Sequence, residues 1–155
     1  DGLTPAATHR LACAFELGRR LAERPIVRGE ELTSTTRVFE RFHARMRDLQ
    51  VEQFWILVLD AKSRVRREFM LSQGTLTNSL VHPRELFRAA MREAANGVVL
   101  DHNHPSGDPE PSPEDRDLTR RLEAVGELVG IQVLDHVVIG NGSFVSFLER
   151  GWLRK

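Results

Sequence analysis

Two histidines and one aspartate are spaced so that they could bind a metal ion. The stretch LDHNHPSGDPEPSPEDRD, residues 100–117, carries His102 and His104 two positions apart. In an extended chain such residues point to the same side, so both imidazoles can face one point. The prolines and glycine that follow allow the chain to fold back, after which Ser112 can cap a helix with Asp115 in its first turn.

This set of side chains favours a catalytic zinc ion, with one ion per chain. Two neutral imidazoles and one carboxylate leave a fourth zinc position open for water, whereas structural zinc sites usually close with four ligands. A water activated in this way also needs a base that lies near the metal without binding it. Glu52, at the start of an apolar run, is one candidate, and Glu85, Glu93 and Glu114 are others.

Simpler interpretations exist for the same residues. Ser112 and Asp115 also form a capping box, which needs no metal, but the two histidines at this spacing favour a metal site. The letters HNH do not indicate an HNH nuclease, whose three residues are dispersed along a hairpin and helix. Asp135 and His136 could orient a metal ligand, or they could satisfy each other inside the sheet, and the second alternative is favoured.

Length and composition indicate one globular domain. The chain has 155 residues, enough for a single core, and its 22 basic and 22 acidic residues cancel. It therefore lacks the overall basic charge of many nucleic-acid-binding domains. Its single cysteine, Cys13, excludes a disulfide framework and is expected to be a small buried residue. With no apolar run of about 18 residues and no signal peptide, a cytoplasmic protein that does not contact membranes is expected.

Two local clusters of basic residues leave a nucleic-acid partner open. Each cluster could hold phosphate groups or could be a solvent-exposed face, and the cluster near the proposed metal could also attract an anionic substrate. The clusters are Lys62, Arg64 and Arg66 on a predicted hairpin, and Arg116, Arg120 and Arg121 along the helix that follows Ser112.

The hydrophobic pattern predicts four helices. Apolar residues recur at helical spacing in residues 4–23, and again from a cap at Ser34 or Thr35 to Leu49. A third helix is expected to begin at Pro83 and to end at Gly97. Its buried stripe would be Leu86, Phe87, Ala90, Met91 and Ala94, and a fourth helix would span residues 113–129 and end at Gly130.

The strands alternate with these helices, which predicts an α/β fold with a mixed sheet. Residues 52–60 form a nearly continuous apolar run, typical of a strand buried on both faces, and residues 65–71 would be its hairpin partner. A short strand leads into His102, and GNG at residues 140–142 would join the last two strands in a tight turn.

The metal-site residues resemble a known motif. These residues are similar to the JAMM motif of the JAB/MPN metalloprotease family. That motif has the order His-x-His, seven residues, Ser, two residues and Asp, with an upstream Glu at the start of a strand. GTLTNSLVHPRELFRAA, HNHPSGDPEPSPEDRDLTRRL and VLDHVVIG resemble the RadC branch of that family, and the resemblance covers residues 52–153. It implies that His102, His104 and Asp115 bind zinc, that Glu52 is the general acid/base, and that Ser112 stabilises an oxyanion.

The resemblance also implies a fold and an activity. The JAB/MPN fold is a curved mixed sheet flanked by helices and is related to cytidine deaminases. Residues 34–155 would form this domain, and residues 1–33 would be an N-terminal helical segment that resembles the tail of a helix-hairpin-helix region. The implied activity is zinc-dependent cleavage of a peptide or isopeptide bond in a peptide or protein substrate. The alternative is a DNA-associated protein that acts in repair, either as a metal-dependent nuclease or as a non-catalytic scaffold.

Overall fold

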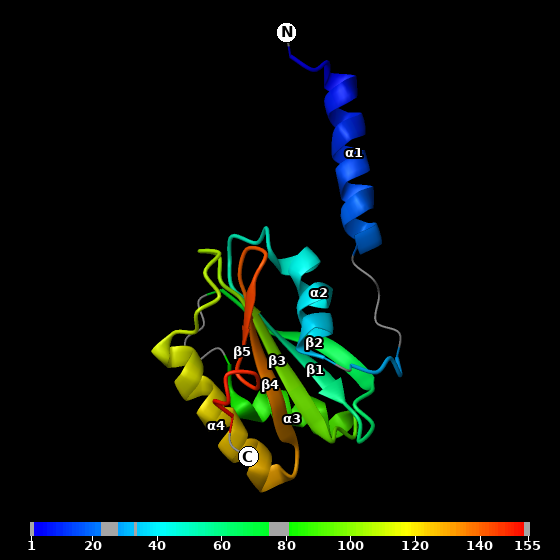
Figure 1. Ribbon diagram of the computed structural model, residues 1–155. Helices are drawn as coiled ribbons and strands as arrows, with labels where there is room; N and C mark the ends of the chain where they lie inside the picture. Colours follow the sequence, from blue (N-terminus) through cyan, green and yellow to red (C-terminus); the bar gives the residue numbers. More distant parts are fainter. Residues whose placement is uncertain (1, 23–27, 33, 75–80, 154–155) are drawn as a thin grey trace.

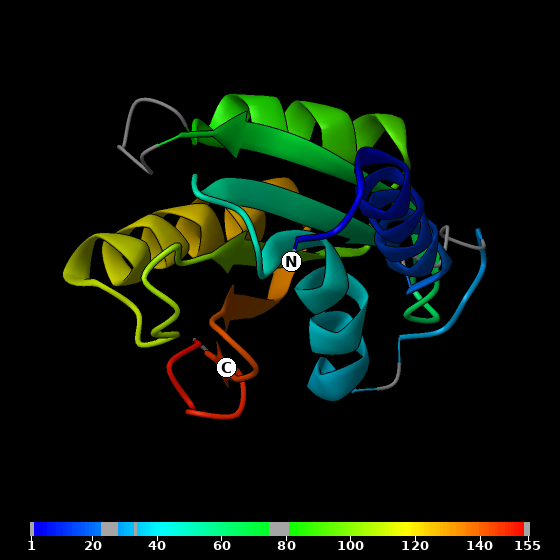
Figure 2. The same ribbon diagram turned by 90° about the horizontal axis from the view of Figure 1, so that it is seen from above.

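A five-stranded mixed sheet forms the centre of the computed structural model, which describes residues 2–22, 28–32, 34–74 and 81–153. The strand order is β2-β1-β3-β4-β5, and only β3 and β4 are parallel. Helices cover both faces of this sheet (Figures 1 and 2). The strands are β1 (Gln53–Leu59), β2 (Val65–Gln73), β3 (Gly97–Asn103), β4 (Gln132–Ile139) and β5 (Phe144–Ser146). The helices are α1 (Pro5–Ala22), α2 (Thr35–Met46), α3 (Pro83–Arg92) and α4 (Pro113–Val129). The predicted α/β class with a mixed sheet is confirmed.

Side chains of β1 enter two separate cores, one on each face of the sheet. Phe54, Ile56 and Val58 pack in a cluster with residues of α3 and α4, whereas Leu57 and Leu59 pack in a cluster with residues of α2. All five side chains are buried. The continuous apolar run therefore reflects a strand covered on both faces, as predicted.

Helix α4 is the crossover that joins the two parallel strands. A parallel pair cannot be linked by a tight hairpin and needs a long connection, here the segment from the end of β3 through α4 to β4. Gly130, in the left-handed region at φ 71°, ends α4 and turns the chain into β4. The start of α4 consequently lies near the end of β3.

Helix α3 ends earlier than predicted, and two of its expected core residues are exposed. The helix ends at Arg92, Ala94 takes a left-handed conformation at φ 50°, and the Ala95 N–H donates to the carbonyl of Ala90. Met91 and Ala94 lie on the solvent side, and the prediction that they are buried is wrong. Gly97 is the first residue of β3 instead of the helix stop.

Helix α1 extends away from the sheet and its helices (Figure 1). Cys13 is exposed, as are the large apolar residues Leu11 and Phe15 on the same helix. The prediction of a buried Cys13 is wrong because described parts of the chain leave this apolar stripe uncovered. Residues 23–27 and 75–80, which include Pro25 and most of the predicted GTLTNS match, lie outside the described residues.

Among the helices that the structure describes, none has the length and apolar character that a membrane span requires. The antiparallel pairing of β4 with β5 confirms the hairpin predicted at GNG. Helix α2 begins after Ser34, whose side chain caps it, as predicted.

Two glycines inside helices give a matched test of packing in this fold. A Cβ at Gly126 in α4 would lie 2.4 Å from the Ile131 carbonyl oxygen and 3.3 Å from the Phe87 ring, whereas a Cβ at Gly18 in α1 would meet nothing within 4 Å. We expect Gly126→Ala to lower the free energy of unfolding by about 1 to 3 kcal/mol despite the better helix propensity of alanine. Gly18→Ala should leave it unchanged or raise it by up to about 1 kcal/mol. Urea unfolding measures both, and equal effects would contradict this packing.

Candidate metal centre

Three side-chain groups converge at one point, between the end of β3 and the start of α4. His102 Nε2 and His104 Nε2 are 3.0 Å apart, and each lies 3.4 Å from an oxygen of the Asp115 carboxylate. Bonds of about 2.0 to 2.1 Å to a tetrahedral zinc ion place ligand atoms about 3.3 Å apart, which matches this arrangement. The structure brings together the three residues predicted from sequence as metal ligands, and this group could hold a metal ion.

Strand β3 aims both histidines to the same side. His102 is fully buried and its ring stacks on Phe54, the cross-strand neighbour in β1, with centroids 5.8 Å apart. His104 follows the end of β3 and is partly accessible to solvent. The alternation of an extended chain therefore places one buried and one accessible imidazole at the site.

The loop after His104 is held by backbone contacts. The His104 carbonyl accepts from the Gly107 N–H, which closes a tight turn, and the Gly107 carbonyl accepts from the Asn141 N–H at 2.9 Å. His104 Nδ1 lies 2.7 Å from the carbonyl oxygen of Asp108. Gly140 permits this close approach, because a Cβ there would lie 2.4 Å from the Gly107 carbonyl oxygen.

A capping box at the start of α4 places the Asp115 carboxylate. The Ser112 hydroxyl donates to Asp115 Oδ2 at 2.6 Å and the Ser112 N–H donates to the same oxygen at 2.8 Å, while the Asp115 N–H donates to Ser112 Oγ. The capping box predicted for this pair is confirmed, and the capping carboxylate also faces the two histidines.

The electrostatics of the group favour an ionised carboxylate beside imidazoles. Burial alone would raise the pKa of Asp115, but its interactions with His102 and His104 outweigh this effect and hold that pKa far below its usual range. The hydrogen bond with Asp115 raises the pKa of His104, against the opposing effect of burial. A cation at this point would compensate the negative charge of the Asp115 carboxylate.

Glu52 lies on the same side of the sheet as the histidines. Phe54 pairs with His102 across the antiparallel strands, and continuing this register by two residues brings Glu52 to His104. The Glu52 charge also contributes to the raised pKa of His104. Glu52 is half-buried and is not one of the three converging residues.

The other candidate acids lie elsewhere or are exposed. Glu85 pairs with Arg84 and Arg88 on α3, and Glu93 pairs with Arg67 of β2 at 3.1 Å. Glu114 is exposed on the first turn of α4. Among the acids named from sequence, Glu52 therefore has the best position for a base.

The side chains of Asp135 and His136 have separate partners, so the favoured prediction that they satisfy each other is wrong for the His136 ring, although the His136 N–H donates to Asp135 Oδ1. Asp135 accepts from the Ser146 hydroxyl at 2.7 Å and from the Leu148 N–H at 2.9 Å, so it stabilises the chain after β5. The His136 ring instead lies against His102, with its Nε2 2.8 Å from His102 Nδ1. Its Nδ1 lies 2.6 Å from the hydroxyl of Thr119. Sequence reasoning missed Thr119, although its position four residues after Asp115 on a helix was an available signal.

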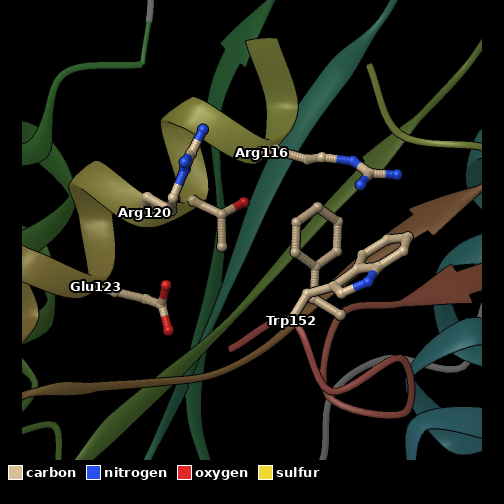
Figure 3. Close-up of a pocket in the computed structure, with 6 residues that line it drawn as sticks. Arg116, Arg120, Glu123 and Trp152 are labelled. Atoms are coloured by element: carbon tan, nitrogen blue, oxygen red, sulfur yellow. The ribbon is translucent and has the colours of Figure 1, made fainter. Parts of the chain in front are cut away.

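The basic residues of α4 border a cavity next to this site (Figure 3). The Arg116 guanidinium lies 4.0 Å from the centroid of Trp152 and pairs with Glu110, and Arg120 pairs with Asp117. The cavity has a volume of about 350 Å³. Its lining residues are Arg116, Thr119, Arg120, Glu123, Phe147 and Trp152.

The remaining basic residues lie away from this cavity. Lys62, Arg64 and Arg66 lie around the turn that follows β1, at the opposite end of that strand from Phe54, and Arg64 pairs with Glu31. Arg121 donates to the carbonyl of Val81. The cluster of Lys62, Arg64 and Arg66 therefore lies at the end of β1 that is remote from His102.

His82 and Arg84, for which the sequence suggested no role, lie at the start of α3. His82 is the N-terminal cap of this helix, because its Nδ1 accepts from the Arg84 N–H at 3.1 Å. The Arg84 side chain is exposed and pairs with Glu85. Both residues therefore have structural roles at this helix start.

Comparison with known proteins identifies the family. The family model described as "RadC-like JAB domain" matches residues 32–152. The chain belongs to this family. A UPF0758 protein of Syntrophotalea carbinolica is 49% identical over 152 residues, which is 98% of this chain and 67% of the relative. The UPF0758 protein STH371 of Symbiobacterium thermophilum is also 49% identical over 152 residues, covering 98% and 64%. The chain thus spans about two thirds of the length of these RadC-like relatives.

Metal content tests the candidate centre directly. We expect the protein to bind about one zinc ion per chain and Asp115→Asn to lose it, because the amide keeps an oxygen for the cap but not the charge. Glu114→Gln, one residue away and exposed, is the matched control. Mass spectrometry of intact protein dialysed against zinc measures the stoichiometry. Equal zinc in wild type and Asp115→Asn would mean that the ion binds elsewhere.

As the pH falls, zinc affinity should begin to decrease at a higher pH than it would for a histidine with the usual pKa. A metal ion needs the neutral imidazole of His104, and protons compete more strongly because the pKa of that group lies above its usual value of 6.5. Below the raised pKa, zinc affinity should fall by about tenfold or more per pH unit. Competition with a chelator between about pH 8 and about pH 5.5 measures the dependence. An affinity that stays constant down to about pH 6 would contradict the raised pKa.

Proposed function

We propose that this RadC-like JAB domain is a zinc-dependent hydrolase that cleaves a peptide or isopeptide bond. The observation that carries the proposal is the convergence of His102, His104 and Asp115, with a carboxylate of Glu52 beside them. Zinc held by the three ligands would polarise the carbonyl of the bond and acidify a water molecule. The other steps fall to side chains of this chain.

Glu52 has the features of a general base. It carries a carboxylate next to His104 without belonging to the ligand group, so it can take a proton from the attacking water. The same carboxyl group can then pass that proton to the leaving amine. Its position where β1 begins, on a rigid sheet, fixes it relative to the histidines of β3.

Ser112 is proposed to stabilise the oxyanion. Its hydroxyl hydrogen points to Asp115 Oδ2 at present, so it must rotate to donate to a substrate oxygen. The Ser112 N–H would still hold the carboxylate during this rotation, and α4 would keep its cap. Loss of such a donor costs on the order of 3 kcal/mol of barrier.

A peptide or protein substrate is favoured over nucleic acid. Arg64, Arg116 and Arg120 all pair with carboxylates, and Arg64 lies at the end of β1 that is remote from the candidate metal site. A DNA partner thus gains no specific support and stays a prediction. The scaffold alternative is less favoured because His102, His104 and Asp115 are all in place.

Replacement of Glu52 separates catalysis from metal binding. We expect Glu52→Gln to keep zinc but to lower cleavage by about 10²-fold or more, since the amide cannot accept the proton. The assay counts new N-termini by mass spectrometry in a library of peptides from a digested bacterial proteome. Glu114→Gln should cleave as well as wild type. Full activity of Glu52→Gln with normal zinc content would rule out this mechanism.

A further inference from the structure

A chain of three hydrogen bonds runs behind the buried ligand His102. His102 Nδ1 lies 2.8 Å from His136 Nε2, and His136 Nδ1 lies 2.6 Å from Thr119 Oγ1. The Thr119 hydroxyl in turn donates to the carbonyl oxygen of Asp115 at 2.7 Å. His102, His136 and Thr119 are almost completely excluded from solvent, so water does not replace these partners.

The direction of every hydrogen in this chain follows from its last member. A carbonyl oxygen can only accept, so the single hydroxyl hydrogen of Thr119 is used on Asp115. The hydroxyl oxygen must then accept from His136 Nδ1–H. The His136 ring is fully buried, stacks on Phe147, and has a histidine and a threonine as its hydrogen-bond partners. A charge buried there without a carboxylate partner would be costly, so this ring is neutral and carries one hydrogen. Its Nε2 is therefore an acceptor for His102 Nδ1–H.

We propose that His136 and Thr119 are positioning residues that fix His102 as the Nδ1–H tautomer and so direct its Nε2 lone pair into the metal site. The reverse arrangement would leave Thr119 Oγ1 and the Asp115 carbonyl oxygen facing each other at 2.7 Å without a hydrogen between them. The inference rests on the metal-binding part of the proposed function. It adds two residues that neither bind the ion nor touch a substrate.

A single backbone carbonyl places a hydrogen on Nδ1 of His104 as well. Its Nδ1 lies 2.7 Å from the Asp108 carbonyl oxygen, which can only accept, so that nitrogen carries a hydrogen. Both histidines consequently present Nε2 to Asp115. The two sides differ because His104 uses a loop carbonyl, whereas His102 depends on side chains from β4 and α4.

This chain of hydrogen bonds also adds no charged group behind His102. Metal-binding histidines are often held by a carboxylate, which would add a negative charge next to the site. Asp135, which precedes His136 in the sequence, accepts from the Ser146 hydroxyl and the Leu148 N–H, and His136 provides a neutral acceptor for His102 instead. Asp115 remains the one anionic side chain among the three converging groups, the other two being histidines.

Thr119→Val gives a sharp test because it removes the hydroxyl while keeping the shape. His136 Nδ1–H would lose its acceptor, the His136 hydrogen should move to Nε2, and that group would then donate to His102 Nδ1. The hydrogen of His102 would move to Nε2, where the metal must bind. We expect zinc affinity to fall by about 10- to 100-fold, the range for loss of a partner of a metal-binding histidine. Thr119→Ser keeps a hydroxyl and should restore both tautomer and affinity.

Two measurements on the whole chain decide the matter. Nitrogen-15 NMR of the histidine rings in metal-free wild type, Thr119→Val and Thr119→Ser reports the tautomers of His102 and His136. Chelator competition with zinc gives the affinities, and near-ultraviolet circular dichroism checks that each variant is folded. A reversed tautomer in Thr119→Val alone supports the inference. An unchanged His102 tautomer in folded Thr119→Val, or an affinity within about twofold of wild type, overturns it.

The outcome is separable from failure of the proposed function. If the wild type takes up no zinc, the hydrolase proposal fails, but the tautomers of the metal-free protein still test the hydrogen-bond chain. If zinc binds and the Thr119→Val tautomer is unchanged, only the role assigned to His136 and Thr119 is lost.

Discussion

The capping box between Ser112 and Asp115 joins the two halves of the candidate metal centre. Strand β3 supplies both histidines, and the first turn of α4 supplies the carboxylate, on a segment of chain that turns back over the strand end. Two donors from Ser112 fix one carboxylate oxygen before any ion arrives. A helix start is also a site of partial positive charge, so the carboxylate is stabilised there without the ion. The ligand group is thus built largely by an interaction that serves folding.

Local sequence signals were sufficient for this part of the protein. The spacing of His102 and His104 determines a shared direction in any extended strand, and Ser112 with Asp115 determines a cap in any helix start. Continuous apolar character likewise predicted that β1 is covered on both faces. These properties depend on neighbours along the chain, so the α/β class and the converging residues could be predicted before the structure.

Features set by distant contacts could not be predicted in this way. The partnership of His136 with His102 depends on the parallel register of β3 and β4, and that of Thr119 depends on how α4 packs over the sheet. Periodicity indicated an apolar stripe on α1 but not whether other residues cover it. For this reason the prediction that Cys13 is buried was wrong. The early end of α3 rests on a left-handed Ala94, a residue type that gives no such signal.

Gly140 shows how a residue without chemistry can be as constrained as a ligand. A Cβ at this position would lie 2.4 Å from the Gly107 carbonyl oxygen and 2.8 Å from Cδ of the Pro109 ring, and neither atom is the end of a flexible side chain that could move aside. Any other residue would push the histidine loop away from the β4–β5 turn. In a survey of all substitutions, Gly140 should therefore tolerate replacement as poorly as the residues of the candidate metal centre, for steric reasons alone. Positions that do not tolerate substitution in this domain would then include residues that support the histidine loop as well as residues of the candidate metal centre.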